Sequence, residues 1–157
     1  MNPKRVLAKD TIIMRLKSDS KDGVIEELID LLVNSGRIKD RKAALKAVVD
    51  REKKMSTGLQ NGIAIPHGKT DTIDSLVAAI GISPDGIPFE SLDGQPAGII
   101  LLTVSPASRT GPHIQFLADI SRVLHNDQTR QRVLHATSEE EVLELLSGDA
   151  PPPSPGA

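Results

Sequence analysis

The sequence predicts a single α/β domain built around a mixed β-sheet. Two nearly continuous apolar runs, residues 76–82 and 97–104, are typical of strands covered on both faces. Segments with apolar residues at helical spacing precede and follow these runs, so helices are expected on both sides of the sheet. A chain of 157 residues is long enough for one such domain to be stabilised by its buried core, without disulfides or a structural metal.

The first half of the chain is expected to form a strand followed by two helices. Residues 11–16 are apolar and β-branched, as strands commonly are. Ser20 is a suitable N-cap for apolar residues at three- and four-residue spacing, and Gly36 ends that helix. Asp40 caps a second helix, and Arg51 is predicted to extend the inward stripe of alanine and valine on it.

The second half is expected to supply the two buried strands and then a run of helices. Turn residues at 56–62 lead into a short extended run at 63–65, and two further turn signals lie between the buried strands. Pro112 begins a helix, Asp127 is expected to cap the next one, and Ser138 opens a capping box for the last. The inner face predicted for the helix after Pro112 consists of Ile114, Leu117, Ala118, Ser121, Val123 and Leu124.

The domain is expected to span residues 1–148, followed by a proline-rich tail over residues 149–157. Four of the eleven prolines fall in this tail, which has nothing apolar to pack and is predicted to be disordered.

Composition excludes several classes of function. The 19 basic and 21 acidic residues give a net charge of −2, which argues against nucleic acid as a partner. The absence of cysteine excludes disulfides, thiolate metal sites and a cysteine nucleophile. No apolar run approaches the ~20 residues of a membrane span, and the start does not resemble a signal peptide. We expect a soluble, cytoplasmic protein with no membrane insertion.

Two of the four histidines occupy positions suited to phosphoryl chemistry. His67 stands between Pro66, which fixes the approach of the chain, and Gly68, which lets backbone N–H groups approach an anion. His113 falls at the second position of the predicted helix, where a phosphate is favoured and an imidazolium is not. From spacing alone, an ordinary loop histidine and an ordinary first-turn surface residue remain open alternatives.

The other two histidines and three rival chemistries are less well supported. His125 and His135 end predicted helices, where a structural role is expected. A phosphate-binding loop needs four residues between its glycines, whereas five separate Gly62 from Gly68. No His-x-His or His-x3-His pair indicates a metal site, and Gly-x-Ser-x-Gly is absent. A histidine nucleophile that carries a phosphoryl group is the chemistry that remains.

The residues around His67 also resemble a known family. Residues 56–69 read Ser-Thr-Gly-Leu-Gln-Asn-Gly-Ile-Ala-Ile-Pro-His-Gly-Lys, which resembles the active-site signature of type-2 EIIA domains. These are the fructose, mannitol and nitrogen-regulatory EIIA proteins of the bacterial phosphoenolpyruvate:sugar phosphotransferase system. Arg51-Glu52 ahead of this block, Leu-Asp-Gly-Gln-Pro at 92–96 and His113 at a helix start extend the resemblance over roughly residues 5 to 147.

The resemblance implies a three-layer α/β/α fold with a mixed sheet and a phosphocarrier activity without metal or cofactor. His67 would take a phosphoryl group on Nε2 from phospho-HPr, or from an HPr-like protein, and pass it to a cysteine of an EIIB partner. His113 would stabilise the phosphoryl group, and Arg51 would supply charge nearby. The remaining residues implied to shape or line the site are Thr57, Gly58 and Gly68.

A second function stays open beside the carrier. In this interpretation the phosphorylation state of His67 controls binding to regulatory target proteins, as in the nitrogen-regulatory branch. The sequence does not distinguish the two, and it assigns no role to Arg109 or to the tail.

Overall fold

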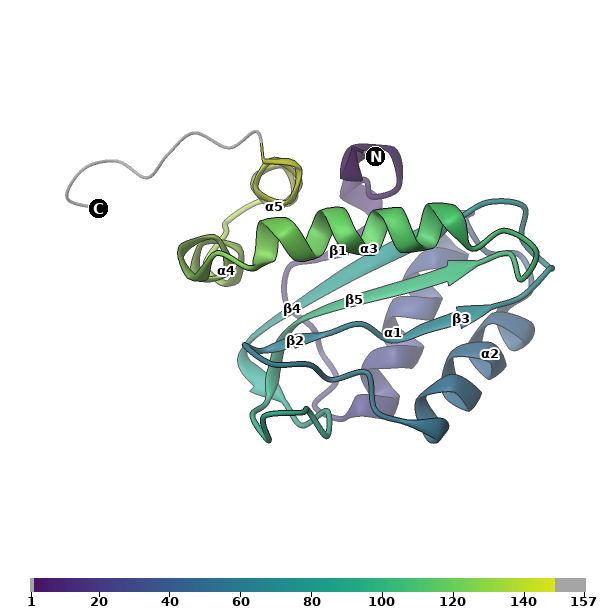
Figure 1. Cartoon of the computed structure of the whole chain (residues 1–157), viewed down its shortest axis with the longest axis horizontal. Coiled ribbons are helices and arrows are strands. Elements are labelled where there is room, and N and C mark those ends of the chain that lie inside the picture. The colour runs from purple at the N-terminus through teal and green to yellow at the C-terminus, as the bar shows by residue number, and fades with distance from the viewer. Residues whose placement is uncertain (1, 149–157) are drawn as a thin grey trace.

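A five-stranded mixed sheet lies between two layers of helices in the computed structural model, which describes residues 2–148 (Figure 1). The strand order is β1-β4-β5-β2, and β3 also pairs with β5. Only the β4–β5 pair is antiparallel among these pairings, so the sheet is mixed. The strands are β1 Ile12–Ile13, β2 Ile63–Ala64, β3 His67–Lys69, β4 Val77–Ile87 and β5 Ala97–Ser105.

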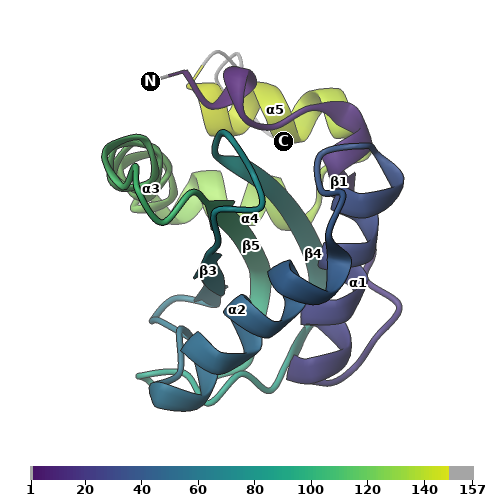
Figure 2. The same cartoon turned by 90° about the vertical axis from the view of Figure 1, so that its right-hand side faces the viewer.

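The helices divide between the two faces of the sheet (Figure 2). On one face lie α1 (Lys21–Asn34) and α2 (Arg41–Lys54). On the other lie α3 (Gly111–Leu124), α4 (Asp127–Leu134) and α5 (Glu139–Ser147). Each face buries its own apolar cluster, and every residue of β5 is buried between them. The predicted α/β/α architecture is therefore confirmed.

The helix starts follow the local signals in the sequence. Ser20, Asp40 and Ser138 are N-caps, and each side chain accepts a hydrogen bond from the backbone N–H three residues later. Gly36 follows the first helix with φ +81°, a conformation that glycine adopts without strain. These predictions are confirmed because capping depends on residues within one turn.

Two strand predictions were wrong in extent. Only Ile12–Ile13 of the predicted 11–16 strand pair with β4, although the Leu16 N–H still donates to the Ile82 carbonyl. The turn predicted between the buried strands is absent at residues 84–86, because β4 continues through it to Ile87. A register irregularity between Ile82 and Ile87 accommodates the extra residues.

Two helix predictions need correction as well. The inner face of α3 begins one residue earlier than predicted, with His113, and continues through Phe116, Ile120 and Leu124. Ile114 is instead 64% exposed, and Ala118 and Ser121 are also exposed. The N-cap of α4 is Asn126, whose side chain accepts from the Thr129 N–H, so Asp127 is the first helical residue.

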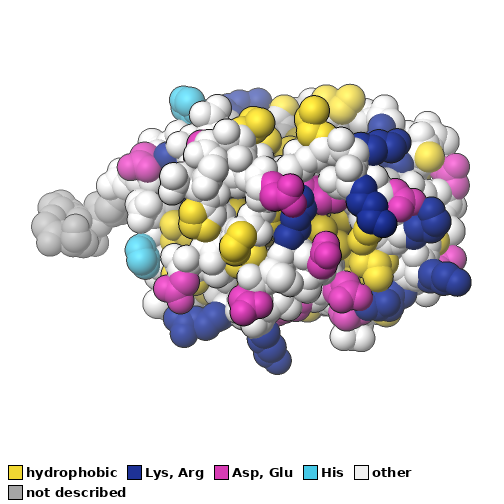
Figure 3. All heavy atoms as spheres, turned by 90° about the horizontal axis from the view of Figure 1, so that it is seen from below, with side chains coloured by type: hydrophobic (Ala, Val, Ile, Leu, Met, Phe, Trp, Pro, Cys, Tyr) yellow, Lys and Arg dark blue, Asp and Glu magenta, His cyan; other side chains and the backbone are white. Residues whose placement is uncertain are grey.

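The surface drawn in Figure 3 carries acidic and basic side chains in alternation, with hydrophobic side chains between them. This face shows no basic stripe of the kind that tracks a nucleic-acid backbone. Within residues 2–148, no helix is long and apolar enough to cross a membrane. The predicted tail lies outside the described residues.

Candidate functional site

His67 is the first residue of β3, at the centre of the candidate site. This strand has no counterpart among the elements predicted from the sequence. Its parallel pairing with β5 sets His67 opposite Thr103. The ring is half-buried, and its Nδ1 lies 3.0 Å from the carbonyl oxygen of Ile65. Because a carbonyl oxygen only accepts, Nδ1 carries the proton and the neutral ring keeps its lone pair on Nε2. Nε2 is therefore the nitrogen available for nucleophilic attack.

His113 lies beside His67 although the two residues are far apart in the sequence. The ring centroids are 5.2 Å apart and the planes are tilted by 44°. His113 is the third residue of α3 rather than the second, and it is only 6% exposed. Its Nε2 lies 2.9 Å from the hydroxyl of Thr103, so β5 supports both histidines.

Electrostatics keep the His113 ring neutral. Burial is the largest cause that lowers the pKa of His113 to about 4, followed by repulsion from His67 when that ring is protonated and by the positive charge of Lys69. A neutral ring was predicted from the helix dipole, whereas the largest cause in the structure is burial. A neutral imidazole at physiological pH offers one N–H and one acceptor nitrogen.

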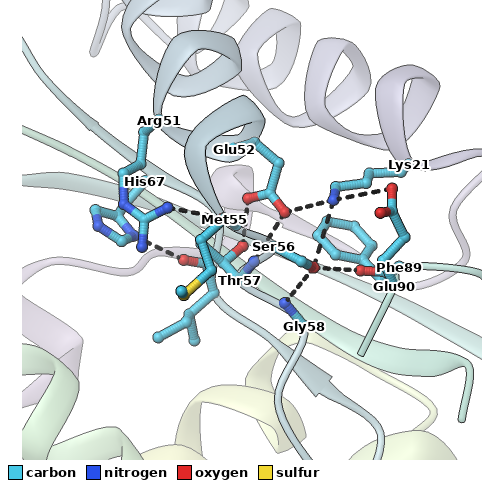
Figure 4. Close-up of polar contacts among 11 residues, drawn as sticks. Lys21, Arg51, Glu52, Met55, Ser56, Thr57, Gly58, His67, Phe89 and Glu90 are labelled. Carbon is cyan, nitrogen blue, oxygen red and sulfur yellow. Dashed lines mark hydrogen bonds and ion pairs between the residues drawn. The ribbon is translucent and has the colours of Figure 1, made fainter. Parts of the chain in front are cut away.

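Arg51 extends from the last turn of α2, the helix that packs against β3. Its guanidinium donates to the Met55 carbonyl at 2.8 Å, which fixes the chain leaving the helix. Figure 4 shows Arg51 and His67 among the side chains gathered where α2 meets the sheet. Arg51 therefore lies at the C-terminal end of α2, on the side of the sheet from which α2 packs against β3. That its positive charge stabilises a phosphoryl group remains a prediction.

The three other predicted site residues have tight packing roles in the structure. Thr57 is 3% exposed and bonds to Glu52 rather than facing solvent. A Cβ at Gly58 would lie 2.8 Å from the Phe89 carbonyl oxygen. A Cβ at Gly68 would lie 2.7 Å from the backbone N of Val48, so glycine is what lets β3 approach α2. Whether these residues also contact a phosphoryl group remains a prediction.

Glu52 and Lys21 are the residues that sequence reasoning missed. Glu52 is buried at 8% exposure, and its carboxylate lies 2.7 Å from the Lys21 ammonium (Figure 4). The buried stripe of α2 runs through Ala44, Val48 and Glu52, not through Arg51 as predicted. That four-residue spacing was the signal that could have identified Glu52, since a carboxylate on a buried stripe needs partners.

Burial alone would raise the pKa of the Glu52 carboxyl. The hydrogen bonds from Lys21 and Thr57 outweigh burial, so the pKa of Glu52 lies below its usual value. The Glu52 carboxylate is therefore charged at neutral pH and bound to Lys21 and Thr57.

Three large hydrophobic side chains are exposed within residues 2–148. They are Met55, Leu92 and Ile114, at 68%, 76% and 64%. Leu92 lines a hollow of about 270 Å³ together with Ile65 and Leu117, among other residues. Ile65, which lines the hollow, is also the residue whose carbonyl accepts from His67. Leu117, which lines it too, lies one helical turn after His113 on α3.

The other candidate residues lie elsewhere in the structure. His125 and His135 are the C-caps of α3 and α4, as their predicted helix-end positions required. Arg109 lines a different pocket with Arg5, about 270 Å³ in volume. Within residues 2–148 no three His, Asp or Glu side chains gather as metal ligands.

Comparison with known proteins gives one consistent family. Residues 5–148 match the family described as phosphoenolpyruvate-dependent sugar phosphotransferase system, EIIA 2. The chain is 39% identical over 128 residues to the fructose-specific EIIA component of Haloferax volcanii, covering 82% of this chain and 83% of that protein. It is 35% identical over 142 residues to the fructose-specific EIIABC component of Bacillus subtilis. That match covers 90% of this chain but spans only 22% of the longer relative.

Solved structures with the same fold carry related names. The nitrogen regulatory protein IIA-Ntr from Neisseria meningitidis superimposes with a TM-score of 0.84 at 27% identity, over 90% of this chain and 97% of that one. The mannitol enzyme IIA from Escherichia coli, in complex with phosphorylated IIB, gives a TM-score of 0.78 at 28% identity. The coverage there is again 90% and 97%.

Proposed function

Because this chain belongs to the type-2 EIIA family of the phosphoenolpyruvate-dependent sugar phosphotransferase system, we propose that it is a phosphocarrier whose His67 holds the phosphoryl group. The observation that carries the proposal is the hydrogen bond from His67 Nδ1 to the Ile65 carbonyl. It leaves the Nε2 lone pair free on a half-buried ring beside a second, neutral histidine.

In the first transfer, Nε2 of His67 attacks the phosphorus of a phosphohistidine on HPr or an HPr-like donor. A new N–P bond forms on His67 while the donor's N–P bond breaks and its imidazole leaves with the electron pair. His67 keeps its Nδ1 proton throughout, because the Ile65 carbonyl holds it.

In the second transfer, a cysteine thiolate of an EIIB partner attacks the same phosphorus. The S–P bond forms as the N–P bond to His67 breaks, which regenerates the neutral ring. The fold shared with a mannitol IIA that was solved with phosphorylated IIB supports EIIB as the acceptor.

His113 and Arg51 would stabilise the phosphoryl group between these steps. In the proposed mechanism His113 is the Nδ1–H tautomer, in which the Thr103 hydroxyl donates to Nε2 and the Nδ1–H can donate to a phosphoryl oxygen. Positioned N–H donors of this kind contribute most where water is excluded, as it is around His113. Arg51 would add positive charge from the end of α2.

Both partners would dock on the apolar surface around His67. Exposed apolar side chains lie on the segments that carry the site, since the Met55 carbonyl accepts from Arg51, Ile114 follows His113, and Leu92 lines a hollow with Ile65. A shared docking surface lets donor and acceptor approach His67 in line with little rearrangement. The cytoplasmic location expected from the sequence remains a prediction.

The nitrogen-regulatory role is the second candidate, and the similarity to the Neisseria IIA-Ntr structure favours it. In that role phosphorylation of His67 would control a target protein rather than feed an EIIB. Neighbouring genes would separate the two, since a sugar EIIB–EIIC gene indicates transport and an alternative sigma-factor region indicates regulation.

The direct test is incubation with the general phosphotransferase enzymes and labelled phosphoenolpyruvate. We expect an acid-labile, base-stable label that maps to His67. Absence of label with every HPr-like donor would overturn the proposal.

A further inference from the structure

A buried ion pair lies behind the candidate site, on the side of the sheet covered by α1 and α2. Lys21 is the first residue of α1, and Glu52 lies in the last turn of α2. Their side chains are 15% and 6% exposed, and Lys21 Nζ is 2.7 Å from Glu52 Oε1. Lys21 also lies over the ring of Phe89, 5.2 Å from its centroid, which holds the ammonium in place.

The Glu52 carboxylate binds the backbone that follows α2. Its Oε1 accepts from the Thr57 N–H at 2.8 Å, and its Oε2 accepts from the Thr57 hydroxyl at 2.6 Å. Three donors from two segments of the chain therefore meet on one carboxylate. Charge-assisted bonds of this kind are short and fix the orientation of the groups that make them.

Two more hydrogen bonds connect Thr57 to the His67 ring. The Thr57 carbonyl accepts from the Ile65 N–H at 3.0 Å, within a tight reversal of the chain. The Ile65 carbonyl in turn accepts from His67 Nδ1 at 3.0 Å. An unbroken series of contacts thus runs from Lys21 through Glu52, Thr57 and Ile65 to His67, and we refer to these five residues as the positioning chain. Figure 4 labels Lys21, Glu52, Thr57 and His67 of this series.

We propose that Glu52, held by Lys21, is a positioning residue that keeps the His67 ring in the Nδ1–H form with Nε2 free. The inference rests on the proposed function, in which Nε2 receives the phosphoryl group. Glu52 itself bonds to Lys21 and Thr57 and acts on His67 only through Thr57 and Ile65.

The energetics of buried ion pairs support this role. Desolvating two charges offsets most of their attraction, so a buried pair contributes little net stability compared with apolar side chains of the same volume. What the pair does supply is geometry, since its donors and acceptors fix one arrangement of the Thr57 backbone. Errors of about 1 Å in the position of a reacting group cost up to about 100-fold in rate, so this geometry matters for His67.

The test uses Glu52→Gln and Lys21→Met in the full chain. The ring nitrogens of His67 are followed by NMR in the unphosphorylated protein, and the rate of phosphoryl transfer from phospho-HPr is measured separately. We expect both variants to lose part of the Nδ1–H population, and the transfer rate to fall by roughly 10- to 100-fold.

The matched control is Asp30→Asn. Asp30 pairs with Arg41 at 2.5 Å and also joins α1 to α2, but neither residue belongs to the positioning chain. We expect Asp30→Asn to keep the wild-type ring signals and transfer rate. If Glu52→Gln does not fold, Thr57→Val removes the hydroxyl donor without adding volume, and Thr57→Ser should restore both readouts.

The outcomes separate the two proposals. Wild-type ring signals and rates in the folded Glu52→Gln and Lys21→Met variants, or in Thr57→Val where Glu52→Gln does not fold, would overturn the positioning role. A wild-type protein that takes no label at His67 would overturn the proposed function instead, whatever the ring signals of the variants.

Discussion

His67 and His113 lie with their ring centroids 5.2 Å apart, yet the fold places them in opposite environments. His67 begins a strand, is half-buried, and has its Nδ1 proton held by a backbone carbonyl. His113 lies on the buried stripe of a helix and has a pKa of about 4. The comparison teaches that backbone contacts and burial decide where an imidazole keeps its proton. In the proposed mechanism this difference decides which ring attacks and which one stabilises.

The largest effect is expected from removing the ring that attacks. His67→Ala should abolish labelling from phospho-HPr, because it removes the Nε2 nucleophile of the proposed mechanism. Circular dichroism should show the wild-type fold, since a half-buried strand residue contributes little to the core. Stoichiometric label in His67→Ala would show that the two histidines have been assigned the wrong way round.

Removing the ring that stabilises should slow transfer without preventing it. His113→Ala leaves Nε2 of His67 intact but deletes an N–H donor, and losses of such donors cost about 100-fold in rate. Rapid-quench measurement of phosphoryl transfer would give the rate. An unchanged rate would mean that His113 has only a packing role.

The two segments that carry the histidines can also be compared through their glycines. Gly68→Ala places a Cβ against the backbone of Val48 and should reduce the free energy of unfolding by about 2 kcal/mol. Gly111→Ala, on the helix of His113, meets no atom within 4 Å and should change it by less than about 0.5 kcal/mol. Urea denaturation measures both, and equal effects would contradict the close approach of β3 to α2.

The last effect, which concerns the buried ring rather than the transfer reaction, is on the pH dependence of stability. The pKa of His113 is lowered to about 4 in the folded state, against about 6.5 in an unfolded chain. As pH falls from 6.5 to 4 the unfolded state binds a proton that the folded state does not, so stability decreases over this interval. His113→Gln should flatten this part of the curve relative to wild type. An unchanged curve would indicate a His113 that titrates normally.

Much of the fold could be predicted because its signals are local. The caps at Ser20, Asp40 and Ser138 and the two long apolar strands each depend on residues within one turn or one strand. The face of α3 was misjudged because its buried stripe includes His113, a polar side chain that hydrophobic spacing does not count. The strand β3 was missed because three residues containing a glycine have no period to detect.

The candidate site divides in the same way. The Pro-His-Gly context and the resemblance around it identified His67 and His113. Arg51 was predicted to lie on the buried stripe of α2, but the residue buried there is its neighbour Glu52. Glu52 and Lys21 could not be paired from the sequence, because they meet only when α1 and α2 pack together.

The sequence by itself determined the α/β class, the two long buried strands, the starts of most helices and the identity of the histidine to examine. Tertiary structure alone decided which nitrogen of His67 is free and how far the pKa of His113 falls. It also decided that the Glu52 side chain binds the Thr57 backbone. The reason is physical: capping and periodicity act over a few residues, whereas desolvation and hydrogen bonding between distant segments exist only once the chain has folded.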